Sequence, residues 1–180
     1  MESAILFGGQ RLDFILDTVK IYKLMQEYKQ GIAYLEKFKA NDSPEIQQQL
    51  ISLYYLTNNY MKVQSIASMY LNQFSRDSNI IHYLAWANEN LGDYEAALSN
   101  LRELLSTEDS YENNLKIADL LHKANKPDEA ITLLQRMLSR FKGQNLAETY
   151  KLLGDVHFSN ANYSYAEDYY SSAISQNPDV

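Results

Sequence analysis

The chain has 180 residues, of which 46% are hydrophobic and 22% are charged, and its formal net charge is -7. This composition is typical of a folded globular protein and not of a disordered one. Cysteine is absent, which excludes disulfides, thiol catalysis and cysteine-ligated zinc. The acidic balance argues against a general phosphate-binding surface, so nucleic acid is not an expected partner.

The first eleven residues hold a short apolar run, Ala4 to Phe7, with no positively charged residue before it. The run is too short for the core of a signal peptide and for a membrane span. We therefore expect a soluble, intracellular, cytoplasmic protein without membrane insertion. Because residues 1–11 include Gly8 and Gly9, we do not expect this segment to be firmly ordered.

From residue 12 onward the sequence predicts helices in a repeating arrangement. The chain has only 6 Gly and 3 Pro, which favours long helices over short strands and tight turns. Tyr or Pro after polar or small residues returns at near-constant spacing in QEYKQGI, NNYMKVQ, GDYEAAL, NKPDEAI and ANYSYAE. This spacing divides the chain into five repeats, 12–43, 44–77, 78–110, 111–146 and 147–180.

Each repeat divides into two amphipathic helical patterns, so about ten helices are expected. In the second helix of the last repeat, Ala166 and Ala173 point in the same direction, and small residues there allow a neighbouring helix to approach closely. In the fourth repeat we expect Asn125 to cap the second helix, with Pro127 in its first turn.

These residues resemble the tetratricopeptide repeat, a helix-turn-helix unit of about 34 residues. The last repeat matches the family pattern at Tyr150, Leu153, Gly154, Tyr163, Ala166, Tyr170, Ala173 and Pro178. The resemblance covers residues 12–180 and implies an all-α fold, a right-handed α-solenoid of antiparallel helix pairs. Residues SQNPDV are typical of the lead-in to another repeat, so we expect the chain to continue in a longer protein.

The first two repeats depart from the family pattern. Phe38 and Tyr70 stand where the pattern prefers alanine, and Val63 stands where a second small residue is typical. Larger side chains at positions of close approach are expected to push the helices apart or tilt them.

In proteins of this family the first helices of the pairs line a concave groove. The resemblance therefore implies a scaffold for protein-protein interaction, which holds a peptide or a protein element in that groove. The candidate groove residues are Lys20, Lys23, Tyr55, His82, Trp86, Glu89, Asp119, His122, Lys151, Asp155 and Phe158.

The only tryptophan, Trp86, has two interpretations of equal weight. It is either an exposed anchor for a partner or a residue that packs between neighbouring first helices. For Tyr55 and Phe158 the packing interpretation is favoured.

The charges of the groove positions indicate the chemistry of a partner. No window fits the basic clamp with which one subclass of the family binds chaperone carboxylates, because Asp119 and Asp155 stand where the clamp needs an amide or a base. Together with Glu89, Glu112 and Glu148, they favour a basic or mixed partner. The alternative for any single acid is an ordinary solvated surface.

Nothing in the sequence indicates an enzyme. His82, His122 and His157 lie in different repeats without the spacing of metal ligands, and no phosphate-binding loop is present. We expect no catalytic residues, no cofactor and no metal. The competing function is architectural: Tyr-rich outer faces would pack against another subunit or another copy of the chain. A homo-oligomer is therefore an alternative.

Overall fold

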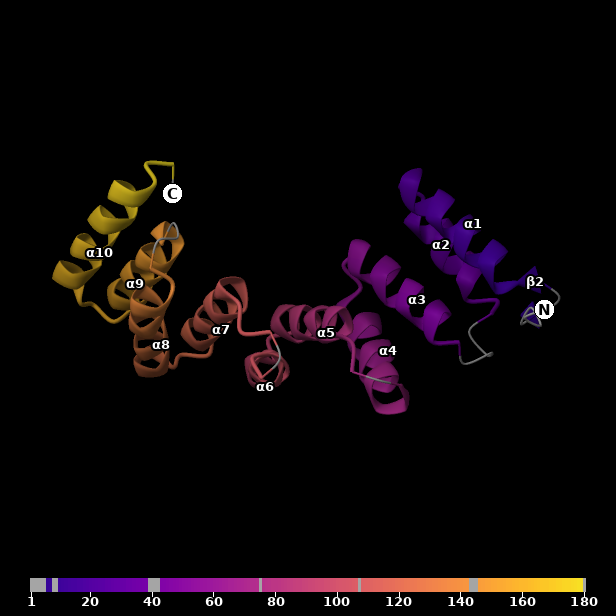
Figure 1. Cartoon of the computed structure of the whole chain (residues 1–180), viewed down its shortest axis with the longest axis horizontal. Coiled ribbons are helices and arrows are strands. Elements are labelled where there is room, and N and C mark those ends of the chain that lie inside the picture. The colour runs from indigo at the N-terminus through magenta and orange to yellow at the C-terminus, as the bar shows by residue number, and fades with distance from the viewer. Residues whose placement is uncertain are drawn as a thin grey trace. The chain divides into compact units, whose positions relative to one another are not determined.

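Ten α-helices occupy the part of the chain that the computed structural model describes, residues 6–7, 10–38, 43–74, 76–106, 108–142 and 146–179 (Figure 1). In chain order they are α1 (Leu12–Leu24), α2 (Tyr28–Leu35), α3 (Pro44–Leu56), α4 (Tyr60–Gln73), α5 (Ser78–Asn90), α6 (Tyr94–Leu104), α7 (Tyr111–Lys123), α8 (Pro127–Arg140), α9 (Ala147–Ser159) and α10 (Tyr163–Gln176). The prediction of an all-α fold of about ten helices is therefore confirmed.

Before the first helix, two short strands pair with each other. Strand β1 (Leu6–Phe7) lies antiparallel to β2 (Gln10–Arg11). Most of the segment that we did not expect to be firmly ordered, residues 1–5 and 8–9, lies outside the described residues. None of the described helices is both long enough and apolar enough to cross a membrane.

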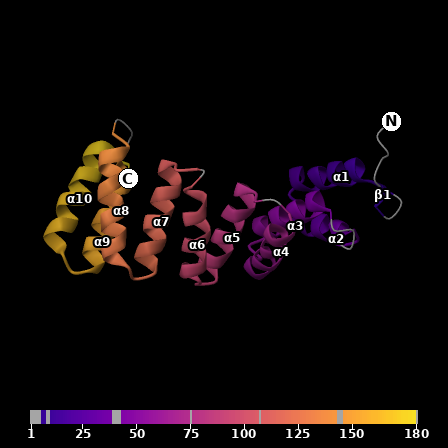
Figure 2. The ribbon, with the colours of Figure 1, turned by 60° about the horizontal axis from the view of Figure 1, so that its bottom comes forward.

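The chain forms two compact units, an N-terminal unit (Met1–Asp93) and a C-terminal unit (Tyr94–Val180). The N-terminal unit holds α1 to α5 and the C-terminal unit holds α6 to α10. Figure 2 shows that the helices of each unit follow one another in chain order, with short turns between them. The boundary falls between α5 and α6, which belong to the same predicted repeat.

The same turn ends the first helix of every predicted repeat. Within the described residues, one position per repeat has a positive φ, and the next amide donates to the carbonyl five residues earlier, as Asp93 does to Asn88 at 2.8 Å. This Schellman arrangement satisfies carbonyls that the helix end would leave unpaired. The positive-φ residues are Gln26, Asn58, Gly92, Asn125 and Ala161.

Because this turn has a constant length, the second helix always begins at the Tyr or Pro of the repeated pattern. Asn125 therefore does not cap α8, which corrects our expectation. Asn125 takes the left-handed conformation (φ 57°), and Lys126 stands at the N-cap without a capping hydrogen bond from its side chain. Pro127 occupies the first turn, where no internal hydrogen bond is lost.

The apolar faces of the helices form the core of each unit. In the N-terminal unit, fully buried Ile15, Leu50, Ile51 and Leu53 belong to one cluster. Two bulky residues at expected close-approach positions, Phe38 and Tyr70, are part of the same core and are only 7% and 4% exposed. In the C-terminal unit the largest fully buried side chains are Leu98, Leu101, Leu120, Leu134 and Met137.

The close approach that the alanines of the last repeat predict is found between α9 and α10. Ala166 and Ala173 are buried, with 1% and 2% exposed surface. Gly154 of α9 meets the ring of Tyr170: a Cβ atom on this glycine would lie 2.5 Å from Cδ1 of Tyr170. The Tyr170 ring therefore occupies the space that any other residue at position 154 would need.

Candidate functional site

A groove runs between α7 and α9, the first helices of two successive pairs in the C-terminal unit. Its volume is about 480 Å³. It is lined by Tyr111, Glu112, Leu115, Lys116, Asp119, Glu148, Lys151, Leu152 and Asp155. Six residues at the family's groove positions thus come together here: Glu112, Leu115, Asp119, Glu148, Lys151 and Asp155.

The groove carries more negative than positive charge. Four of its lining side chains are carboxylates and two are lysines. Asp119 accepts from Nζ of Lys123 at 2.8 Å and from Nζ of Lys116 at 3.4 Å, so its charge is partly compensated. Glu112 and Glu148 are exposed, and neither carboxylate pairs with a described side chain.

Two hydrogen bonds hold the frame of the groove. The hydroxyl groups of Tyr111 and Thr149 lie 3.0 Å apart and link α7 to α9. The Tyr170 hydroxyl donates to Oδ1 of Asp155 at 2.8 Å. Burial, and then the bonded Asp155 carboxylate, raise the pKa of Tyr170 to about 12, so this hydroxyl keeps its proton at neutral pH.

The α7 side of the groove, together with Glu148 of α9, lies within a segment that sequence comparison recognises. A tetratricopeptide repeat family model matches residues 91–149, which contain α6, α7 and α8. Residues 91–149 therefore carry tetratricopeptide-repeat sequence. No curated protein matches the sequence significantly.

Solved structures of tetratricopeptide-repeat proteins have the same fold. A crystal structure of the MamA protein superposes with a TM-score of 0.80 at 14% identity, over 92% of this chain and 91% of that one. YrrB, a TPR protein with an unusual peptide-binding site, superposes with a TM-score of 0.75 at 16% identity, over 92% of this chain and 86% of that one. An ArsTM double mutant of MamA RS-1 superposes with a TM-score of 0.79 at 9% identity, over 93% of this chain and 94% of that one. At these identities the likeness shows the fold.

In the N-terminal unit, the two candidate lysines differ. Lys20 is exposed on α1. Lys23 is half-buried, and its Nζ donates to Oε1 of Gln49 at 2.7 Å and to Oγ of Ser52 at 2.9 Å. Burial lowers the pKa of Lys23, because its bonded partners are neutral and desolvation disfavours the charge. Lys23 therefore links α1 to α3.

Trp86 belongs to an aromatic cluster of four side chains in the N-terminal unit. The centroid of its ring lies 4.4 Å from that of Tyr55 and 4.8 Å from that of Tyr60, and Tyr55 in turn lies 4.8 Å from Tyr83. All four rings are half-buried and pack against the core. The packing interpretation therefore describes what Trp86 and Tyr55 contact in this structure.

The remaining candidates are spread over three helices. His82 and Glu89 are half-buried on α5, and His122 is half-buried in the last turn of α7. Phe158 on α9 is 57% exposed, although packing was the favoured interpretation, and its ring meets Tyr163 edge-on at 5.5 Å. None of these four lines the α7–α9 groove.

Sequence reasoning missed three groove-lining residues, Tyr111, Lys116 and Leu152. Each is the immediate sequence neighbour of a residue at one of the family's groove positions. Including the neighbours of the groove positions among the candidates would therefore have found them. Among the described residues, no group of three or more His, Asp or Glu side chains is placed to hold a metal ion.

Proposed function

We propose that this chain is a non-enzymatic scaffold that binds a basic peptide segment in the α7–α9 groove. The observation that carries this proposal is the pair of exposed carboxylates, Glu112 and Glu148, on either side of a groove with leucines in its lining. Lys or Arg side chains of a peptide would meet Glu112 and Glu148, and an apolar side chain between them would contact Leu115 and Leu152.

The likeness to tetratricopeptide-repeat proteins, one of them with an unusual peptide-binding site, supports a role in protein interaction. The size of the groove supports contact with a short stretch of peptide and not with a whole folded surface. We expect the affinity to be modest, since ordering a peptide costs much of the contact energy.

The charge preference is testable with two labelled peptide pools. One pool carries Lys or Arg on both sides of a leucine, and the other carries Asp or Glu at the same places. We expect the basic pool to bind more tightly in fluorescence polarisation. The double variant Glu112→Lys with Glu148→Lys should weaken that binding about tenfold, which corresponds to ~1.4 kcal/mol.

The matched control is Glu167→Lys with Asp168→Lys, which changes the net charge equally at two exposed positions of α10. The control should keep the wild-type affinity. Equal weakening by both double variants would mean that only net charge acts, and equal binding of the two pools would remove the basic-peptide proposal.

A second function is favoured by a specific surface of the N-terminal unit. The outer side of α1 exposes Phe14, Ile21, Leu24 and Met25, each by more than half, as one apolar stripe. Asp17 and Lys20 are exposed beside it, so a second α1 in antiparallel orientation would place each acid opposite a base. We propose that two copies of the chain associate through this stripe.

Light scattering coupled to gel filtration tests this association. The wild-type mass is expected to rise toward a dimer with increasing concentration, because the stripe loses water on contact. Leu24→Lys should keep the monomer mass throughout, whereas Met61→Lys, at a residue 72% exposed on α4, should behave like the wild type. A wild-type mass that stays monomeric would eliminate the α1 interface.

A further inference from the structure

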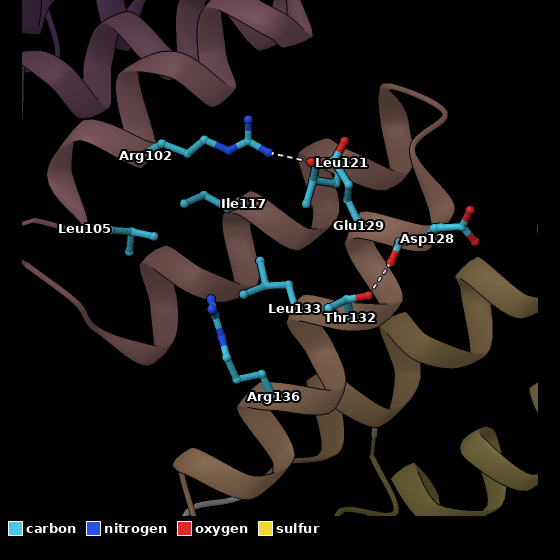
Figure 3. Close-up of a pocket in the computed structure, with 9 residues that line it drawn as sticks. All are labelled: Arg102, Leu105, Ile117, Leu121, Asp128, Glu129, Thr132, Leu133 and Arg136. Atoms are coloured by element: carbon cyan, nitrogen blue, oxygen red, sulfur yellow. Dashed lines mark hydrogen bonds and ion pairs between the residues drawn. The ribbon is translucent and has the colours of Figure 1, made fainter.

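A second pocket, of about 410 Å³, lies in the C-terminal unit among α6, α7 and α8 (Figure 3). Its lining residues are Arg102, Leu105, Ile117, Leu121, Asp128, Glu129, Thr132, Leu133 and Arg136. It shares no residue with the α7–α9 groove, because Ile117 and Leu121 lie on a different side of α7 from Leu115 and Asp119.

The interior of this pocket is apolar, formed by Leu105, Ile117, Leu121 and Leu133. At one end, Nη2 of Arg102 is bound to Oε2 of Glu129 at 2.8 Å, so these two charges compensate each other. Figure 3 shows the carboxylate of Asp128 directed away from Leu133.

Arg136 places a guanidinium group at the pocket, and its positive charge contributes, after the hydrogen bond from Asn114, to the lowered pKa of the nearby Asp109. Its side chain extends past Leu133 toward the side of Leu105 (Figure 3), and its guanidinium forms no hydrogen bond or ion pair with a described residue. The nearby carboxylate of Asp109 already accepts from Asn114 at 2.7 Å and pairs with Arg140. Arg136 is therefore free to bind another carboxylate in a bidentate manner.

The next helix pair indicates which side chain fits an apolar pocket at this place. By their order within the helices, Leu121, Glu129 and Leu133 correspond to His157, Tyr165 and Tyr169. In that pair the rings stack: His157 lies 5.3 Å from both Tyr165 and Tyr169. In the α9–α10 pair, aromatic rings thus fill this place. In the α7–α8 pair, the corresponding side chains are not aromatic and line an open pocket.

We propose that the α6–α7–α8 pocket binds an acidic peptide, with an aromatic side chain inserted among Leu105, Ile117, Leu121 and Leu133 and the adjacent carboxylate bound by Arg136. The charge preference is opposite to that of the α7–α9 groove, and the proposal does not depend on that groove. The chain then offers two separate peptide sites within one unit.

The probe is a fluorescein-labelled Gly/Ser peptide that carries one phenylalanine followed by aspartate. In fluorescence polarisation it should bind more tightly than two control peptides, one with serine for the phenylalanine and one with asparagine for the aspartate. Arg136→Gln should weaken the phenylalanine-aspartate peptide about tenfold and make it equal to the asparagine peptide.

Two further variants make the outcome decisive. Leu133→Tyr copies the residue of the next pair and should abolish binding by filling the pocket, with its helicity checked by circular dichroism. Lys142→Gln removes an equal charge at an exposed position of the same unit that lines neither pocket, and it should leave this peptide unaffected. If Leu133→Tyr does not fold, the Arg136→Gln variant alone decides. The proposal is overturned if Arg136→Gln binds the phenylalanine-aspartate peptide as tightly as the wild type does. It is also overturned if the wild type binds the serine control peptide as tightly as the phenylalanine-aspartate peptide.

Discussion

Replacing Trp86 with alanine is expected to lower the free energy of unfolding by about 2–3 kcal/mol. The loss follows from the ring contacts of Trp86 with Tyr55 and Tyr60, at 4.4 and 4.8 Å, which alanine cannot make. Replacing a buried tryptophan with alanine costs about 3–5 kcal/mol. Because Trp86 is only half-buried, we expect a smaller loss than this range gives for a buried tryptophan. Urea unfolding followed by circular dichroism measures the change, since the variant has no tryptophan fluorescence.

Met61→Ala is the matched control for this experiment. It removes a large apolar side chain of the same unit that is 72% exposed, and its effect should stay within about 0.5 kcal/mol. Trp86→Phe keeps a ring in the cluster and should lower the free energy of unfolding by less than Trp86→Ala does. If Trp86→Ala is as stable as the control, the ring contributes no packing energy. This result would favour the interpretation of Trp86 as an exposed anchor for a partner.

Gly154→Ala is expected to destabilise the C-terminal unit by about 2 kcal/mol, although alanine is normally the better helix former by about 1 kcal/mol. The added methyl group would lie 2.5 Å from Cδ1 of Tyr170, far inside van der Waals contact. The ring cannot move away without cost, because its hydroxyl is bound to Asp155. Thermal unfolding of the wild type and the variant measures the effect.

A double variant distinguishes steric overlap from other causes. Gly154→Ala combined with Tyr170→Leu removes the ring that the methyl group meets, so the cost of the alanine should fall well below its cost in the wild-type background. If the alanine costs the same with and without Tyr170, the close approach of α9 and α10 at this glycine is not its cause. A stabilised Gly154→Ala would contradict the expected overlap directly.

The Tyr170–Asp155 hydrogen bond ties this packing to the candidate groove. Asp155 lines the groove between α7 and α9, and the tyrosine that orients it comes from α10. For this reason we expect the groove variants Glu112→Lys and Glu148→Lys to change peptide binding without disturbing the packing, whereas substitutions at position 155 or 170 are expected to change both.

The sequence by itself determined where the helices begin. The first helices start at Leu12, Pro44, Ser78, Tyr111 and Ala147, the residues at which the repeated pattern begins a new repeat. These signals are local: the period of apolar residues, the turn of constant length and proline in a first turn act within a few residues of chain. The all-α fold of tetratricopeptide type could therefore be predicted.

Only the tertiary structure decided what the candidate side chains contact. Trp86 and Phe158 both fall at expected groove positions, yet Trp86 packs against the rings of Tyr55 and Tyr60 while Phe158 stays 57% exposed. The apolar pocket beside Arg136 has no sequence signal either, because it exists only where leucines replace the stacked rings of the next pair. Exposure and cavities depend on the volumes of side chains from other helices, and a pattern within one helix carries no information about those volumes.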